Sequence, residues 1–134
     1  MKALSVFILG LILAVLPVAG SASESICYGT PKKGKLKNGV QLPRVGNNYQ
    51  VFSDLGYSLG RTYVHSRVAE IIQASYSQLE TALPNTIFVY GDSGWKSGGR
   101  FKPHKTHQNG LSVDFMVPIL DPSGKSIPLP SGPQ

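Results

Sequence analysis

A chain of 134 residues has room for one modest domain, which excludes an architecture of several domains. Its formal net charge of +6 at pH 7 favours an anionic partner over a cationic one. The only cysteine, Cys27, has no companion in the sequence, so an internal disulfide framework is excluded.

The first 23 residues have the pattern of a secretory signal peptide. Lys2 precedes the apolar run Ala3–Val18, and small residues follow from Ala19 to Ser23. The run is shorter than the roughly 20 residues of a membrane-spanning helix. We therefore expect cleavage between Ala19 and Ser23, a periplasmic mature protein and a domain over residues 24–134. The alternative is a retained membrane anchor.

Residues 24–50 are rich in Gly, Pro, Lys and Asn, which predicts an extended segment with several turns. Four lysines lie close together in it: Lys32, Lys33, Lys35 and Lys37. An exported protein rarely meets nucleic acid, and no aromatic residue is interleaved with these lysines, so nucleic-acid binding is excluded. An anionic cell-wall polymer is the better candidate partner, and a solvated basic loop is the simpler alternative.

The most regular pattern predicts a helix from about Thr62 to Leu83, which Pro84 ends. A short strand is expected near Val51, and the apolar run Thr86–Tyr90 predicts a buried strand. The expected core face of the helix follows three- and four-residue steps and comprises Val64, Val68, Ile71, Ile72, Ser75, Leu79 and Leu83.

Two of the three histidines, His104 and His107, lie three positions apart, and Asp114 follows seven positions later. Imidazole and carboxylate groups together suit a divalent metal such as zinc. Alternation over Leu111–Val117 predicts a strand on which Asp114 points away from the apolar face. The expected fold is therefore α+β, an antiparallel sheet with a flanking helix and the site on a loop between two strands.

A family resemblance adds to this pattern. Gly98-Gly-Arg-Phe101 followed by His104-x-x-His107-Gln-x-Gly-Leu-x-x-Asp114 resembles the motif of the penicillin-insensitive murein endopeptidases, zinc peptidases related to lysostaphin and the D-alanyl-D-alanine peptidases. The similarity covers most of residues 34–130. One departure is Ser112, where many relatives carry aspartate.

The resemblance implies a role for each residue of the motif. His107 and Asp114 are the implied zinc ligands, and Arg100 stabilises an oxyanion. His104 binds substrate or orients His107, with a role as a metal ligand as the alternative. For Arg100, a structural role in bracing the loop is the alternative. The implied reaction is zinc-dependent hydrolysis of the D-alanyl–diaminopimelate cross-link of peptidoglycan.

A catalytic zinc needs three protein ligands, and relatives supply the third from a C-terminal His-x-His segment. No histidine follows His107 in this sequence. We therefore expect the N-terminal portion of a zinc peptidase domain, incomplete as given, which binds zinc weakly and does not itself cleave cross-linked muropeptides. The alternative is a non-catalytic or vestigial protein that binds the cell wall.

Two further segments have more than one interpretation. His65 lies at the predicted helix start, where relatives often carry histidine, and it either caps or packs there or contributes to function. Gly91-Asp92-Ser93-Gly94 resembles the nucleophile segment of chymotrypsin-like proteases, but the chain is too short for that fold and Trp95 replaces a glycine. Asp92 and Ser93 are therefore expected to shape the loop or contact substrate at its edge.

Overall fold

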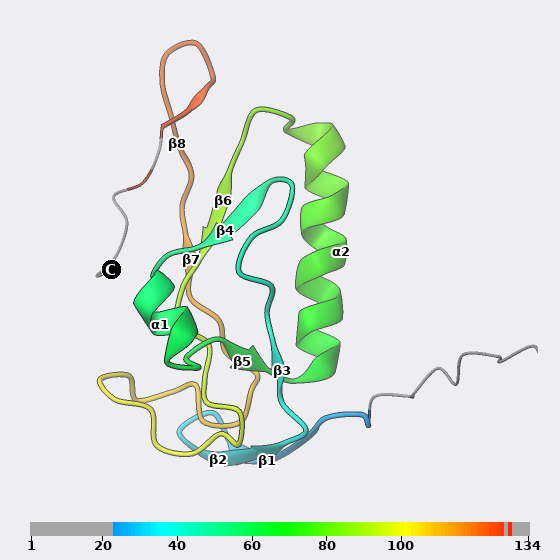
Figure 1. The fold of residues 1–134 in the computed structure, drawn as a ribbon, viewed down its shortest axis with the longest axis vertical. Coiled ribbons are helices and arrows are strands. Elements are labelled where there is room, and N and C mark those ends of the chain that lie inside the picture. Colours follow the sequence, from blue (N-terminus) through cyan, green and yellow to red (C-terminus); the bar gives the residue numbers. More distant parts are fainter. Residues whose placement is uncertain (1–22, 128, 130–134) are drawn as a thin grey trace, which may run out of the picture.

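The computed structural model describes residues 23–127 and residue 129, which form an α+β domain, as the sequence predicts (Figure 1). The predicted signal peptide lies outside these residues, apart from Ser23. Within the described part, no helix has the length and apolar character needed to cross a membrane. The elements in chain order are β1 (Ile26–Thr30), β2 (Lys33–Lys37), β3 (Val40–Gln41), β4 (Tyr49–Val51), α1 (Asp54–Ser58), β5 (Tyr63–Val64), α2 (Ser66–Ala82), β6 (Phe88–Tyr90), β7 (Phe115–Met116), β8 (Ile119–Leu120) and β9 (Ser126–Ile127).

The central sheet has three strands in the order β4-β6-β7, and α2 runs alongside it (Figure 1). Strands β6 and β7 are antiparallel, as predicted, but β4 and β6 are parallel. The parallel pair follows from the long connection between them, because α2 carries the chain back to the starting edge of the sheet. The other three pairs, β1-β2, β3-β5 and β8-β9, are antiparallel.

Helix α2 begins four residues later than the sequence predicts. Tyr63 and Val64 instead form β5, which pairs with β3. His65 then caps the helix, and its Nδ1 accepts a hydrogen bond of 3.1 Å from the backbone N–H of Arg67. Helical periodicity alone assigned Tyr63 and Val64 to the first turn of the helix, but strand pairing places them in β5.

The buried face of α2 agrees with the predicted one only in part: Ile72 is buried, and Val68 and Leu79 pack against the core. Its buried residues are Ala69, Ile72 and Tyr76, whereas Ile71 is 54% exposed and Ser75 is exposed. Two apolar faces of the helix are compatible with the sequence, one through Ile71 and one through Tyr76. Packing of the aromatic ring of Tyr76 determines which of them is buried. Tyr76 stacks on Tyr49 of β4 and on Phe88 of β6, with ring centroids 4.6 and 5.5 Å away.

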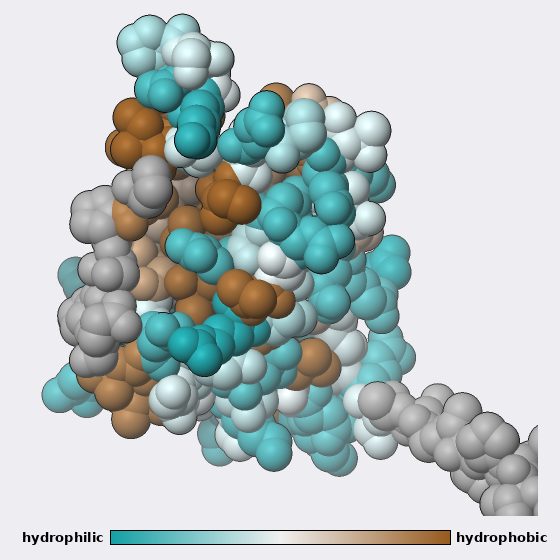
Figure 2. Space-filling view, turned by 45° about the horizontal axis from the view of Figure 1, so that its top comes forward, coloured by the Kyte–Doolittle hydropathy of each residue, from teal (hydrophilic) through white to brown (hydrophobic). Residues whose placement is uncertain are grey.

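The predicted strand Leu111–Val117 is reduced to the two residues of β7. Asp114 and Met116 line one hollow, but Asp114 also lines a second hollow together with Val113 and Phe115, so the predicted alternation holds only in part. The apolar side, however, is largely exposed, with Phe115 at 56% and Val117 at 80%. Figure 2 shows apolar side chains in separate patches on one face of the molecule.

Two short elements were not predicted as such. Residues 26–37 form the β1-β2 hairpin rather than an irregular extended segment. Helix α1 begins after Ser53, whose hydroxyl accepts a hydrogen bond of 3.0 Å from the N–H of Gly56. This cap offsets the low helix propensity of Gly56 over a single turn.

We expect Tyr76→Phe to leave the free energy of unfolding unchanged or raise it, whereas Tyr90→Phe lowers it by about 1 kcal/mol. The buried Tyr76 hydroxyl makes no hydrogen bond within the described residues, and burial raises its pKa to about 12. The Tyr90 hydroxyl donates to the carbonyl of Pro43 at 2.8 Å. Urea unfolding followed by circular dichroism measures both. An equal loss of unfolding free energy in the two variants would contradict the expectation that only the Tyr90 hydroxyl forms a stabilising hydrogen bond.

Candidate metal centre

The loop that carries both histidines is organised around Phe101, whose side chain is fully buried. Its ring centroid lies 5.6 Å from that of His104 and 5.5 Å from that of His107. Trp95 packs edge-on against the same ring at 5.0 Å. One apolar residue from the Gly-Gly-Arg-Phe segment therefore supports both imidazoles.

His107 is buried and has a φ of 70°, in the left-handed region that residues other than glycine rarely adopt. Its Nδ1 lies 3.2 Å from the carbonyl oxygen of Ser93, and its Nε2 lies 3.2 Å from Oδ1 of Asp114. A carbonyl only accepts hydrogen bonds, so Nδ1 is the protonated nitrogen. In neutral His107 the lone pair of Nε2 therefore faces Asp114.

Asp114 stands at the end of the backbone pairing that continues from β6 and β7. Its N–H donates to the carbonyl of Asp92 at 3.0 Å, and its carbonyl accepts from the N–H of Gly91 at 2.8 Å. These two bonds fix the backbone of Asp114 directly across from the segment that follows Tyr90. The side chain of Asp114 is thereby held beside those of His104 and His107.

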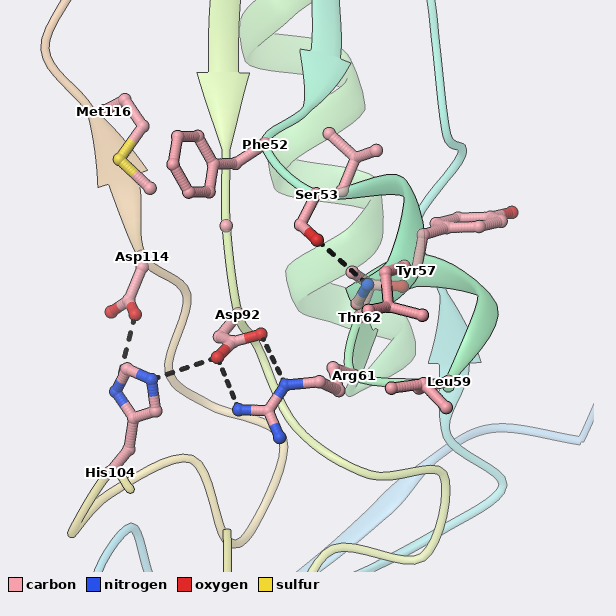
Figure 3. A pocket seen from close by; sticks show the side chains of 14 residues that line it. Phe52, Ser53, Tyr57, Leu59, Arg61, Thr62, Asp92, His104, Asp114 and Met116 are labelled. Atoms are coloured by element: carbon pink, nitrogen blue, oxygen red, sulfur yellow. Dashed lines mark hydrogen bonds and ion pairs between the residues drawn. The ribbon is translucent and has the colours of Figure 1, made fainter. Parts of the chain in front are cut away.

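His104 is held by an ion-paired carboxylate (Figure 3). Arg61 donates from Nε and from its second terminal nitrogen to the two oxygens of Asp92, at 2.9 and 2.6 Å. His104 Nε2 lies 3.0 Å from Asp92 Oδ2. Burial alone raises the pKa of Asp92, but hydrogen bonding and charge from Arg61, with a smaller part from His104, hold it below its usual value.

Because Asp92 is an ionised acceptor, His104 donates to it from Nε2. The lone pair of neutral His104 is then on Nδ1, which lies 3.6 Å from Oδ2 of Asp114. The lone pairs of both histidines therefore point at one carboxylate, with no proton between them when all three groups have their usual charge. This electron-rich arrangement of lone pairs and carboxylate oxygens suits a cation.

His104, His107 and Asp114 fit a metal ion by this criterion. One ligand atom from each lies within 4.8 Å of the others. The second nitrogen of each imidazole donates to an oxygen of Asp92 or Ser93, which is how proteins fix the orientation of metal-binding histidines. Two imidazoles and a carboxylate suit zinc, with other divalent transition metals as alternatives.

Two hollows flank the cluster, and Asp114 lines both. The first has a volume of about 460 Å³ and runs past Arg61, Asp92 and His104 to apolar side chains that include Phe52 and Leu59 (Figure 3). The second has a volume of about 490 Å³ and is lined by His107 and by apolar residues of α2 and the β7 region. A chain-like molecule that occupied both hollows would cross the three candidate ligands.

The other predicted site residues lie away from this cluster. Arg100 is exposed, lines neither hollow, and contributes its carbonyl to a hydrogen bond from Trp95 Nε1 at 3.2 Å, so its oxyanion role stays a prediction. His65 is the cap of α2. The Ser93 hydroxyl is buried and donates to the carbonyl of Gly91 at 3.3 Å, which supports the structural interpretation of that segment.

Sequence reasoning missed Arg61 and the pairing of Asp92 with it. Arg61 follows a glycine 46 positions before His107, and nothing local distinguishes it from a surface arginine. Its guanidinium carbon lies 4.2 Å from the centroid of the Phe101 ring, which adds a cation–π contact.

The profile of the penicillin-insensitive murein endopeptidase family matches residues 27–127. The chain belongs to this family. A penicillin-insensitive murein endopeptidase from Escherichia coli (strain SE11) is 35% identical over 104 residues, and one from Klebsiella pneumoniae (strain 342) is 32% identical over 104 residues. Each comparison covers 77% of this chain but 35% of the relative, so the chain spans about a third of the length of these relatives.

The positive φ of His107 leads to a test of backbone strain. We expect His107→Gly to be more stable than His107→Ala by about 1 kcal/mol, because alanine keeps the steric cost of a left-handed residue and glycine removes it. At Ser75, exposed within α2, the same pair should show the opposite order. Urea unfolding of the four variants measures both differences. If His107→Ala were more stable than His107→Gly, the backbone at position 107 would have relaxed out of the left-handed conformation.

Proposed function

We propose that the chain provides the zinc site of an endopeptidase that hydrolyses the D-alanyl–diaminopimelate cross-link of peptidoglycan. The observation that supports this most is the convergence of two imidazole lone pairs on one carboxylate, in a member of a murein endopeptidase family. Periplasmic location after removal of residues 1–23 belongs to the same proposal. An N-terminal mass with Met1 intact, on protein recovered from cells, would count against that location.

In this proposal His107 Nε2 and an oxygen of Asp114 hold the ion, and His104 stands beside them as a third candidate group. A bound zinc ion would supply a Lewis acid that polarises the scissile carbonyl. Ser93 and Asp92 keep the two imidazoles in the tautomers that leave a lone pair facing Asp114. The two hollows give the peptide a path on either side of the ion.

Two arginines are candidates for stabilising the oxyanion of the hydrolysis reaction. Arg100 is proposed from the family motif, although its side chain is exposed. Arg61 lines the hollow next to His104, and its side chain is 17% exposed. The position of Arg61 favours it over Arg100, because an oxyanion donor has to reach the carbonyl that the ion polarises.

We expect the chain to bind zinc weakly, and His107→Ala and Asp114→Ala each to lower the affinity by about tenfold or more. His104→Ala lowers it by less if His104 only orients its neighbours, and by as much if it is a ligand. The matched control is His65→Asn, which removes a histidine outside the cluster and keeps a capping residue. Competition with a chromophoric chelator measures all four variants. Equal loss in His65→Asn and His107→Ala would exclude this cluster as the site.

Hydrolysis is tested on purified cross-linked peptidoglycan with zinc or with a chelator. We expect no release of monomers by the chain itself, and chelator-sensitive release by a chimera that adds the remaining part of the Escherichia coli relative. His107→Ala in the chimera should abolish release, and Arg61→Lys should lower it more than Arg100→Lys. Chelator-sensitive release by the chain alone would mean that His104 completes the site. A folded, zinc-binding chimera without activity would contradict the proposed reaction.

A further inference from the structure

The β1-β2 hairpin presents one basic face to solvent. In its register Ile26 is opposite Lys37, Tyr28 opposite Lys35, and Thr30 opposite Lys33. Directly opposed residues of an antiparallel pair point to the same side, and alternate residues of a strand do so as well. These six side chains therefore share one face, which we call the outer face, and all six residues are exposed.

The three lysines form an evenly spaced row along β2. Alternate residues of a strand are about 6.6 Å apart, so the row covers about 13 Å. This spacing is within the Debye length of about 10 Å at 0.1 M salt, so neighbouring charges add to one positive field. A row of this kind matches a polymer with repeated negative groups better than it matches a single small anion.

No acidic side chain forms an ion pair with this row among the described residues. Neither strand nor the turn between them contains Asp or Glu, and the ion pairs found among the described residues involve arginines and histidines but no lysine. The three ammonium groups are therefore available to an external partner. Tyr28 and Ile26 add apolar surface beside them.

The inner face of the hairpin is occupied by the site loop. Leu36 is buried, and the carbonyl of Pro31 accepts a hydrogen bond of 3.1 Å from the N–H of Gln108. A Cβ on Gly34 would lie 2.7 Å from the Cβ of Asn109, so the two backbones are in close contact. The basic row is therefore fixed in position relative to His107 rather than carried on a free arm.

We propose that the outer face of the hairpin binds the carboxylate-bearing stem peptides of peptidoglycan and holds the chain on its substrate. The choice of this polymer rests on the proposed function, whereas the preference for a polyanion rests on the lysine row alone. Nucleic acid is the less suitable partner, because single strands bind through successive aromatic platforms and the outer face has only Tyr28.

The test is sedimentation of the chain with purified peptidoglycan in the presence of a chelator, so that neither turnover nor metal contributes. We expect binding at about 0.05 M NaCl that weakens by about tenfold at about 0.3 M. The variant Lys33→Gln/Lys35→Gln/Lys37→Gln should bind about tenfold more weakly than the natural chain at the lower salt concentration. Because these side chains are exposed, the circular dichroism spectrum and the unfolding midpoint should not change.

The matched control is Lys102→Gln/Lys105→Gln/Lys125→Gln, which removes the same charge from exposed positions elsewhere. We expect this control to bind peptidoglycan as the natural chain does. An equal loss of binding in the two triple variants would mean that only net charge matters, which would overturn the proposal. Tighter binding to a single-stranded oligonucleotide than to peptidoglycan would overturn it in favour of nucleic acid. Retained peptidoglycan binding by a folded chimera that releases no monomers would contradict the proposed reaction and would leave the proposed binding surface supported.

Discussion

The close approach of the site loop to its neighbours is the constraint on which the centre depends. A Cβ on Gly110 would lie 2.8 Å from the backbone nitrogen of His65, and one on Gly98 would lie 2.3 Å from the carbonyl oxygen of Gln108. The absence of side chains there lets the His65 N–H donate to the Gly110 carbonyl at 2.9 Å. The helix start, the hairpin and the loop thus meet at backbone contact beside His107, whose φ of 70° is in the left-handed region. Hydrogen bonds on both sides of the loop offset that strain.

Electrostatics then determine what this constrained loop can bind. Arg61 neutralises Asp92 in a bidentate pair whose side chains are 17% and 24% exposed, a setting in which either partner alone would be costly. The paired carboxylate keeps its ability to accept from His104 without adding net charge to the cluster. Asp114 is left beside the two imidazoles as a carboxylate that no arginine or lysine pairs with among the described residues. The carboxylate of Asp92 therefore orients a candidate metal ligand, whereas the carboxylate of Asp114 can itself be a metal ligand.

Local pattern and family motif predicted the α+β class, the helix, the short strands and the grouping of His107 with Asp114. They failed where the answer depended on contacts between distant segments. Helical periodicity could not distinguish a stripe through Ile71 from one through Tyr76, because the partner rings come from β4 and β6. The role of Arg61 could not be assigned, because it depends on the ion pair with Asp92, which lies 31 positions away in the sequence. The start of the helix was wrong for the same reason, because Tyr63 pairs with a residue of β3 and not with the next helical turn.

The charge distribution of the whole site follows from these contacts. With Asp92 balanced by Arg61, the three candidate ligands carry one formal negative charge, so a divalent ion would leave the centre with one positive charge. A site with that residual charge would stabilise negative charge that develops on a bound carbonyl oxygen, and it would attract an anionic ligand. The lysine row on the far side of the hairpin adds a second positive field, fixed to the first through the Pro31–Gln108 hydrogen bond. With an ion bound, the proposed metal centre and the proposed lysine surface would both favour a carboxylate-bearing peptide polymer, from opposite faces of one hairpin.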